Sequence, residues 1–273
     1  MIAAAMRAPQ STAARDSVLK LHRDGAFGRI SIAPLARVAP ANPPIPESGT
    51  VAAIRYSNSG VSADSVRRTG RGGARNRADR ESNALTTAQV DGLRAATAHA
   101  CAIGLPFTRM FSIHWEAAGI ALARMAWATG RFIDLLTKTL ARHGSATALV
   151  WVHEGGESKG GHCHLLAYVP AALARLVAGR QRGWLRRITG RPYRARVIKS
   201  DPIGGRLGLE VSNPALHAVN LASALDYVLK GASPVAAAQF GLERLEAGGR
   251  IIGKRCGTSQ NIAAKARSEG ARR

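Results

Sequence analysis

Two kinds of hydrophobic spacing alternate along the chain after residue 85. Alternating, β-branched and aromatic residues are typical of strands, and they occupy residues 107–116, 146–154, 161–169 and 193–200. Apolar residues near helical spacing predict helices at about 86–104, 119–143, 171–190 and after Asn213. Strands that neighbour one another as hairpins, with helices between them, indicate an α+β fold with an antiparallel sheet flanked by helices.

The last long helix is marked at both ends by residues that favour helix boundaries. Asn213 can cap its start, and Pro214 suits its first turn. Gly231 and then Pro234 predict its end. The segment before it, residues 206–212, is a further possible strand.

Residues 1–85 lack sustained periodicity of either kind. A Pro-rich stretch fills 34–49, and six arginines lie among glycines between Arg67 and Arg80. Such a composition does not bury a core, so we expect a disordered Arg- and Pro-rich arm, whose arginines either contact phosphates or form a solvated linker. This divides the chain into an arm at 1–85, a folded domain at 86–240 and a basic tail at 241–273.

The tail contains a basic, polar sequence, GKRCGTSQN, at residues 253–261. Lys254, Arg255 and Ser259 could hold phosphates there, and a solvated tail is the equal alternative.

The charge balance favours a polyanionic partner. The chain has 39 Lys and Arg against 17 Asp and Glu, a net charge of +22, which makes nucleic acid the leading candidate. An anionic membrane surface competes, but no stretch approaches the roughly 20 apolar residues of a spanning helix. The apolar run from Ile2 to Met6 is too short for a secretory signal, so we expect a soluble cytoplasmic protein.

Part of this positive charge lies on one helix. Five arginines cover much of the surface expected for residues 171–190: Arg175, Arg180, Arg182, Arg186 and Arg187. The three cysteines are odd in number and widely spaced, which predicts reduced thiols and no disulfide framework.

Two histidines two residues apart indicate a metal site. In a strand, His162 and His164 leave the same face, while Cys163 points away. The preceding strand ends in His153 and Glu154, and the short connection GGESKG favours a hairpin that brings one of them beside the pair. Either residue would supply a third ligand, and a carboxylate would complete a two-His, one-carboxylate site.

Tyr227 and Lys230 are spaced i and i+3 and therefore share a helix face. A neighbouring ammonium can favour the phenolate of a tyrosine, which makes it a nucleophile. The alternative is an ordinary amphipathic helix with a half-buried tyrosine and a solvated lysine.

Three motifs in order resemble the HUH endonucleases, in particular their single-tyrosine replication initiators. The motifs are MFSIHWEAAG at 110–119, GGHCHLL at 160–166 and YVLK at 227–230, and the resemblance covers roughly 107–232. It implies an RRM-like sheet with a divalent ion, magnesium or manganese, on the two histidines of GGHCHLL. It also implies Glu154, in preference to His153, as the third metal ligand, Tyr227 as the nucleophile and Lys230 as an assisting charge.

The same resemblance implies site-specific nicking and rejoining of single-stranded DNA at a replication origin, through a 5′-phosphotyrosine, to initiate rolling-circle replication of a plasmid or phage. No Gly-rich loop ending in Gly-Lys-Ser or Gly-Lys-Thr occurs, so we expect unwinding by a host helicase, with no nucleotide cofactor and no small-molecule substrate. A plasmid-mobilisation relaxase and a single-tyrosine transposase are the alternatives within the enzyme class. Outside it, the alternative is a non-catalytic basic nucleic-acid-binding protein.

Overall fold

The computed structural model of this chain describes residues 80–156 and 159–270. Almost all of the expected N-terminal arm, including its Pro-rich stretch and all but one of its clustered arginines, lies outside the described residues. The two residues at the tip of the predicted hairpin lie outside them as well.

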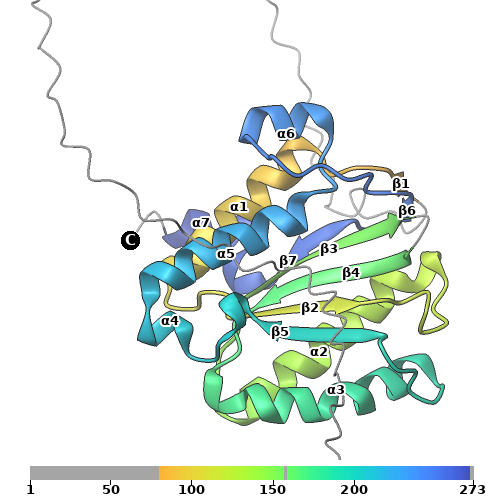
Figure 1. Cartoon of the computed structure of the whole chain (residues 1–273), viewed down its shortest axis with the longest axis horizontal. Helices are drawn as coiled ribbons and strands as arrows, with labels where there is room; N and C mark the ends of the chain where they lie inside the picture. Colours follow the sequence, from red (N-terminus) through yellow and green to blue (C-terminus); the bar gives the residue numbers. More distant parts are fainter. Residues whose placement is uncertain (1–79, 157–158, 271–273) are drawn as a thin grey trace, which may run out of the picture. The chain divides into compact units, whose positions relative to one another are not determined.

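The described residues contain a five-stranded antiparallel sheet, in the order β5-β2-β4-β3-β7. Figure 1 shows it at the centre, with β3 and β4 side by side. The α+β prediction is therefore confirmed. The strands are β2 (Arg109–Ile113), β3 (Leu149–Gly156), β4 (Gly160–Ala167), β5 (Ile198–Pro202) and β7 (Cys256–Thr258).

Helices cover both faces of this sheet. Alternate strand residues such as Val152 and Leu166 join one hydrophobic cluster with α1 (Thr87–Ala102) and α5 (Pro214–Leu229). The residues between them, such as Trp151 and Leu165, join a second cluster with α2 (Met125–Arg142) and α3 (Ala174–Thr189). The period of two along each strand therefore decides which layer of helices a side chain meets.

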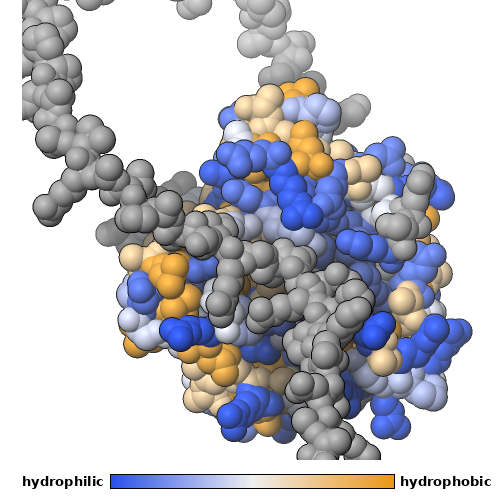
Figure 2. Space-filling model, in the orientation of Figure 1, coloured by the Kyte–Doolittle hydropathy of each residue, from blue (hydrophilic) through white to orange (hydrophobic). Residues whose placement is uncertain are grey.

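The remaining elements are short. They are β1 (Glu81–Ser82), α4 (Leu209–Ser212), α6 (Pro234–Phe240), β6 (Ile251–Ile252), α7 (Ala264–Gly270) and the 3₁₀ turns at Leu122–Arg124, Ala171–Leu173, Ile203–Gly205 and Gln260–Ile262. On the face shown in Figure 2, hydrophobic residues gather in small areas near α4 and α6, where Val211 and Val235 are exposed. None of the helices among the described residues is long and apolar enough to cross a membrane.

Local sequence explains the helix boundaries. Thr86 and Gln89 form a reciprocal capping box at the start of α1. The side chain of Asn213 accepts a 3.0 Å hydrogen bond from the backbone N–H of Leu216, and Pro214 occupies the first turn of α5, as predicted. The helix ends at Leu229, close to the predicted stop.

The possible strand at 206–212 is wrong. Its second half forms α4, whose N-terminal cap is Gly208. Gly204, Gly205 and Gly208 all have positive φ, at 75°, 75° and 73°. This left-handed backbone suits glycine and interrupts an extended strand.

Both ends of the folded region lie beyond the predicted boundaries at 86 and 240. At the N-terminal side, β1 pairs with β6, and Leu85 is completely buried. At the C-terminal side, β7 extends the main sheet by pairing with β3. Residues 81–85 therefore do not belong to an arm, and residues 251–262 are not a solvated tail, because both segments are held by strand pairing and core contacts.

Candidate metal centre

The β3–β4 hairpin places three side chains together. Glu154 lies directly opposite His162, and His164 is opposite Val152, so all three side chains leave the same face of the sheet. His153 is opposite Cys163 on the other face. The predicted same-face arrangement of the two histidines is therefore confirmed, and the strand register brings Glu154 beside them, not His153.

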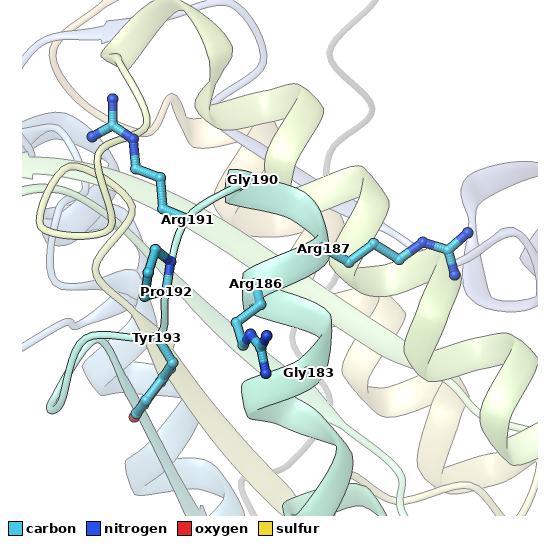
Figure 3. A pocket seen from close by; sticks show the side chains of 7 residues that line it. All are labelled: Gly183, Arg186, Arg187, Gly190, Arg191, Pro192 and Tyr193. Carbon is cyan, nitrogen blue, oxygen red and sulfur yellow. The ribbon is translucent and has the colours of Figure 1, made fainter.

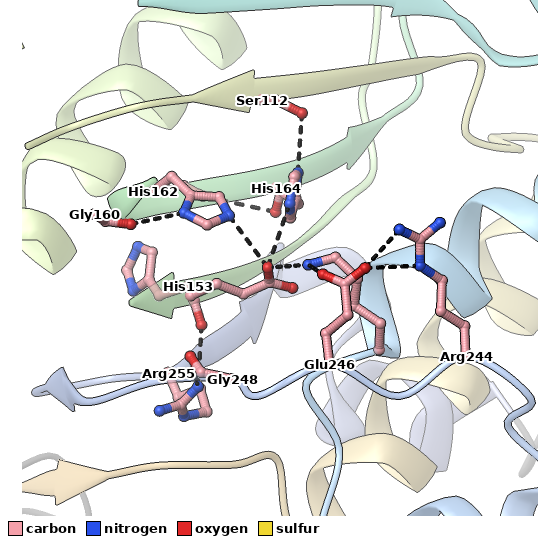
Figure 4. A network of polar contacts seen from close by, with 12 residues as sticks. Ser112, His153, Gly160, His162, His164, Arg244, Glu246, Gly248 and Arg255 are labelled. Atoms are coloured by element: carbon pink, nitrogen blue, oxygen red, sulfur yellow. Dashed lines mark hydrogen bonds and ion pairs between the residues drawn. The ribbon is translucent and has the colours of Figure 1, made fainter. Parts of the chain in front are cut away.

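The ligand atoms of this group converge on one point (Figure 4). His162 Nε2 lies 3.1 Å from Glu154 Oε2, and His164 Nε2 lies 3.6 Å from the same oxygen. One nitrogen or oxygen from each residue can be chosen so that all lie within 4.8 Å of one another, and all three residues are buried. Such a group can hold a metal ion.

The other ring nitrogen of each histidine is fixed by a hydrogen bond. His162 Nδ1 donates to the backbone carbonyl of Gly160 at 2.9 Å, and His164 Nδ1 shares a 2.9 Å hydrogen bond with Ser112 Oγ. These contacts set the ring orientations, so that both Nε2 atoms face Glu154. Histidines that bind metals are held in this way, by a partner on the nitrogen that does not ligate.

Two buried atoms of the group, Glu154 Oε1 and His164 Nε2, have no hydrogen-bond partner among the described residues. Leaving such atoms buried and unsatisfied is costly. The Nδ1 proton of His162 is already used on Gly160, so its Nε2 can face a carboxylate favourably only with a second proton or a cation between them. Two imidazoles and one carboxylate therefore fit a divalent ion with open positions.

The charge state of the group suits a cation. Burial raises the pKa of Glu154, but its contacts with His162, His164 and Lys230 outweigh burial and hold that pKa well below its ordinary value. Burial lowers the pKa of His164, which favours the neutral imidazole that ligates metals. The carboxylate is therefore ionised and His164 is neutral near pH 7.

Lys230 reaches this group from the end of α5. Its side chain is buried, forms an ion pair with Glu154 and lies 3.1 Å from a carboxylate oxygen of Glu246. Burial lowers the pKa of Lys230, but the two carboxylates raise it above its ordinary value, so the ammonium keeps its charge. The alternative of a solvated lysine is wrong, because this ammonium lies among the candidate ligands.

Tyr227 lies against the same group. Its ring centroid is 5.1 Å from that of His164, with the rings nearly perpendicular. Two cations lie over the ring, Lys230 Nζ at 5.2 Å and the Arg244 guanidinium at 4.8 Å from its centroid. The fold thus brings together the five site residues that the resemblance implies, from β3, β4 and the C-terminal end of α5: Glu154, His162, His164, Tyr227 and Lys230.

The structure adds residues to the site that the sequence did not assign. His114 stacks on His162 with ring centroids 5.3 Å apart, and Glu116 accepts a 2.7 Å hydrogen bond from the backbone N–H of Gly161. Both belong to MFSIHWEAAG, the first of the three motifs, to which the sequence analysis assigned no site residue. Arg244 and Glu246 lie in the segment expected to be a tail, where no sequence pattern indicated their role.

The residues of the 253–261 sequence make contacts within the fold. Arg255 is buried, and its guanidinium donates to Ser82 Oγ at 2.9 Å and to the carbonyls of His153 and Gly248 at 3.3 and 3.2 Å. Ser259 Oγ accepts a 3.1 Å hydrogen bond from Leu149 N. The expectation that Arg255 holds phosphate is therefore wrong, since its donors are used to join segments of the protein.

Comparisons with known proteins give no match to a protein-family model, to a curated protein or to a solved structure.

Proposed function

We propose that this chain is a metal-dependent enzyme of the HUH type, which nicks and rejoins single-stranded DNA with Tyr227 as the nucleophile. The observation that carries this proposal is the position of Tyr227, whose ring lies 5.1 Å from that of His164. A helix supplies the phenol, two strands supply the candidate ligands, and Lys230 contacts both. A nucleophile beside a cation site is the arrangement that phosphoryl transfer needs.

The reaction follows from these groups. A divalent ion, magnesium or manganese, held by Glu154, His162 and His164 would polarise the scissile phosphate. Tyr227 Oη forms a bond to phosphorus, the bond from phosphorus to the 3′ oxygen breaks, the phenolic proton passes to solvent and the 3′ oxygen takes up a proton. The 5′ phosphate stays on the tyrosine, so attack by a 3′-hydroxyl reverses the step without a nucleotide cofactor.

Two side chains have supporting roles in this scheme. The ammonium of Lys230 stabilises negative charge that develops as Tyr227 attacks. Ser112 positions His164 through its hydrogen bond to Nδ1.

The biological setting belongs to the same proposal. A net charge of +22 supports a nucleic-acid substrate, and two histidines with one carboxylate favour a replication initiator over a relaxase, which commonly has a third histidine. We infer initiation of rolling-circle replication at an origin of a plasmid or phage, with a host helicase as partner. The antiparallel sheet with helices on both faces supports an HUH-type, RRM-like arrangement of the site.

The test is formation of a covalent adduct. The full chain is incubated with manganese and a labelled single-stranded DNA library of random sequence, and adducts that survive denaturing electrophoresis are mapped by peptide sequencing. We expect the DNA to be attached at Tyr227 and the adduct to be lost in Tyr227→Phe. Tyr168 directly follows the C-terminal end of β4, and Tyr168→Phe, the control, should retain the adduct. An adduct that persists in Tyr227→Phe would overturn the assignment, and salt-sensitive binding without any adduct would favour a non-catalytic protein.

A further inference from the structure

The proposed function leaves the arginines of α3 without a role. Between Lys159 and Ser200 the sequence contains no acidic residue. Eight arginines lie in this stretch, on α3 and on the segment that leads to β5: Arg175, Arg180, Arg182, Arg186, Arg187, Arg191, Arg194 and Arg196. Positive charge is therefore concentrated locally, not spread evenly over the molecule.

Some of these arginines surround a cavity of about 760 Å³ at the C-terminal end of α3. In Figure 3, Arg186 lies between Arg191, which points toward a neighbouring loop, and Arg187, which points to the opposite side. The size is within the roughly 300–1,000 Å³ of ligand pockets. The lining residues are Gly183, Arg186, Arg187, Gly190, Arg191, Pro192 and Tyr193.

Within residues 80–156 and 159–270, no acidic side chain forms an ion pair with Arg186, Arg187 or Arg191. Other arginines do have such partners, as Arg250 has Glu81. Positive charge near the last turn of α3 offsets the helix dipole, but this is worth only about 0.3–1 kcal/mol per residue at a surface. Three exposed arginines that line one cavity and form no ion pair with a carboxylate in the described part of the chain are available to an external anion.

The turn at residues 115–119 lies between the cavity and the candidate metal centre. The Arg191 side chain fills the space where a Cβ on Gly119 would lie, and Arg194 Nη1 donates to the carbonyl of Ala117 at 3.0 Å. The same turn contacts the candidate site, because Glu116 accepts from the backbone of Gly161 and His114 stacks on His162. A strand of nucleic acid that occupies both places would cross residues 114–119.

We propose that this cavity binds the phosphodiester backbone of the single-stranded DNA that flanks the nick. The inference rests on the proposed function for its choice of ligand, and it assigns a second contact region to the same substrate. Guanidinium groups recognise phosphate oxygens through paired hydrogen bonds. Holding the flanking strand there positions the scissile phosphate in front of Tyr227 and discourages loss of the cleaved end before rejoining.

The test compares two pairs of substitutions on the same helix. Arg186→Gln with Arg187→Gln alters the cavity, and Arg175→Gln with Arg180→Gln removes the same charge from exposed positions outside it. Both are made in the full chain carrying Tyr227→Phe. Binding of a fluorescein-labelled oligothymidylate is measured by anisotropy in chelator at several salt concentrations, and thermal unfolding checks that each variant folds.

We expect the cavity pair to weaken binding about tenfold near 0.15 M salt and to reduce the slope of log affinity against log salt by about 1.4, since each single-strand phosphate contact contributes about 0.7. The control pair should change affinity less than about threefold. Equal effects from both pairs, or no effect from the cavity pair, would overturn the proposal. If the cavity pair destabilises the fold, Arg191→Gln tests the cavity from its loop side, with an expected slope reduction of about 0.7 for one contact and Arg175→Gln as the matched control.

This experiment separates the two proposals. Absence of any adduct with unsubstituted Tyr227, together with selective weakening in the cavity pair, removes the proposed nicking activity and retains a single-strand binding cavity. An adduct at Tyr227 with equal binding by both pairs retains the nicking activity and removes the cavity.

Discussion

Each face of the β3–β4 hairpin carries a buried histidine, His153 on one face and His164 on the other, but the hydrogen bonds of the two rings differ. On the α2 side, His153 Nε2 accepts a 2.8 Å hydrogen bond from Thr129, and His153 Nδ1 donates to the carbonyl of Lys254 at 2.8 Å. On the α5 side, His164 has Ser112 on Nδ1, and its Nε2 has no hydrogen-bond partner among the described residues. Both rings are buried, so burial alone does not distinguish them.

The two histidines differ in whether both ring nitrogens have a hydrogen-bond partner within the described residues. Trp115 Nε1 donates to Thr129 Oγ1 at 2.8 Å, and the same hydroxyl serves His153, so each donor meets an acceptor. Burial lowers the pKa of His153 to about 4, and the ring is therefore neutral near pH 7. A histidine whose two nitrogens are satisfied internally holds the structure together, whereas one with an inward-facing, unsatisfied nitrogen beside a carboxylate can bind a ligand.

The largest effect expected from this comparison is on catalysis. Under the proposed function, His164→Ala should reduce adduct formation at least about 100-fold, since it removes a candidate metal ligand and not merely a residue that orients one. The free energy of unfolding should change little beyond the loss of packing, because an unsatisfied atom is removed. Adduct yield and chemical denaturation measure the two effects. His153→Ala is the matched control, and the comparison breaks if it reduces adduct yield per folded molecule as much as His164→Ala does.

The next effect concerns stability. Thr129→Val should lower the free energy of unfolding by about 2–6 kcal/mol, because it leaves Trp115 Nε1 and His153 Nε2 buried without partners, at roughly 1–3 kcal/mol each. Thr129→Ser keeps the hydroxyl and should cost less. Urea denaturation measures both variants. A Thr129→Val protein as stable as the Ser variant would show that the hydrogen-bonded chain contributes nothing.

Added metal should sharpen the contrast between the two faces. Manganese at 100 times its dissociation constant should stabilise the folded protein by about 2.7 kcal/mol, since only the folded state assembles the site. Thermal unfolding with and without a chelator measures this shift. The shift should disappear in Glu154→Gln and persist in Thr129→Ser. An equal shift in the Glu154→Gln variant would place the bound metal elsewhere.

The smallest expected effect comes from the hydroxyl that orients the ligand. Ser112→Ala should weaken manganese binding about tenfold, because His164 loses the hydrogen bond that fixes its ring. Ser112→Thr retains a hydroxyl and should recover most of the affinity. Titration calorimetry gives both dissociation constants. If the Ser112→Ala and Ser112→Thr variants bind manganese equally well, the hydrogen bond to His164 does not contribute to metal affinity.

Local patterns in the sequence were sufficient for the outline of the sheet and for the position of the two candidate histidine ligands. Alternation along β4 placed His162 and His164 on one face, and the short hairpin connection placed either His153 or Glu154 beside them; the strand register of the structure brings Glu154 there. The capping residue Asn213 predicted where α5 begins. These features depend on residues close together in the chain, where spacing determines geometry.

The features that the sequence did not predict depend on contacts between distant segments. The burial of Lys230 is caused by Glu154, 76 positions away, together with Glu246 from a segment expected to be a tail. The strand β7 is only three residues long, and it becomes a strand by pairing with β3. No periodicity within such short segments can indicate a partner so far along the chain.

Arg255 lies late in the chain, and its guanidinium connects this late segment to the β3–β4 hairpin and to residues near the start of the described region. It contacts the carbonyl of His153, 102 positions earlier, and Ser82, 173 positions earlier. During synthesis the ribosome therefore releases both histidines and Glu154 long before the arginine and β7 that support the outer edge of their hairpin. A growing chain therefore carries the candidate metal ligands before it carries the segment that pairs with the outer edge of their hairpin. Under the proposed function, a chain that ends before residue 258 would lack part of the framework around the site, and the complete site would assemble only after that segment has been made.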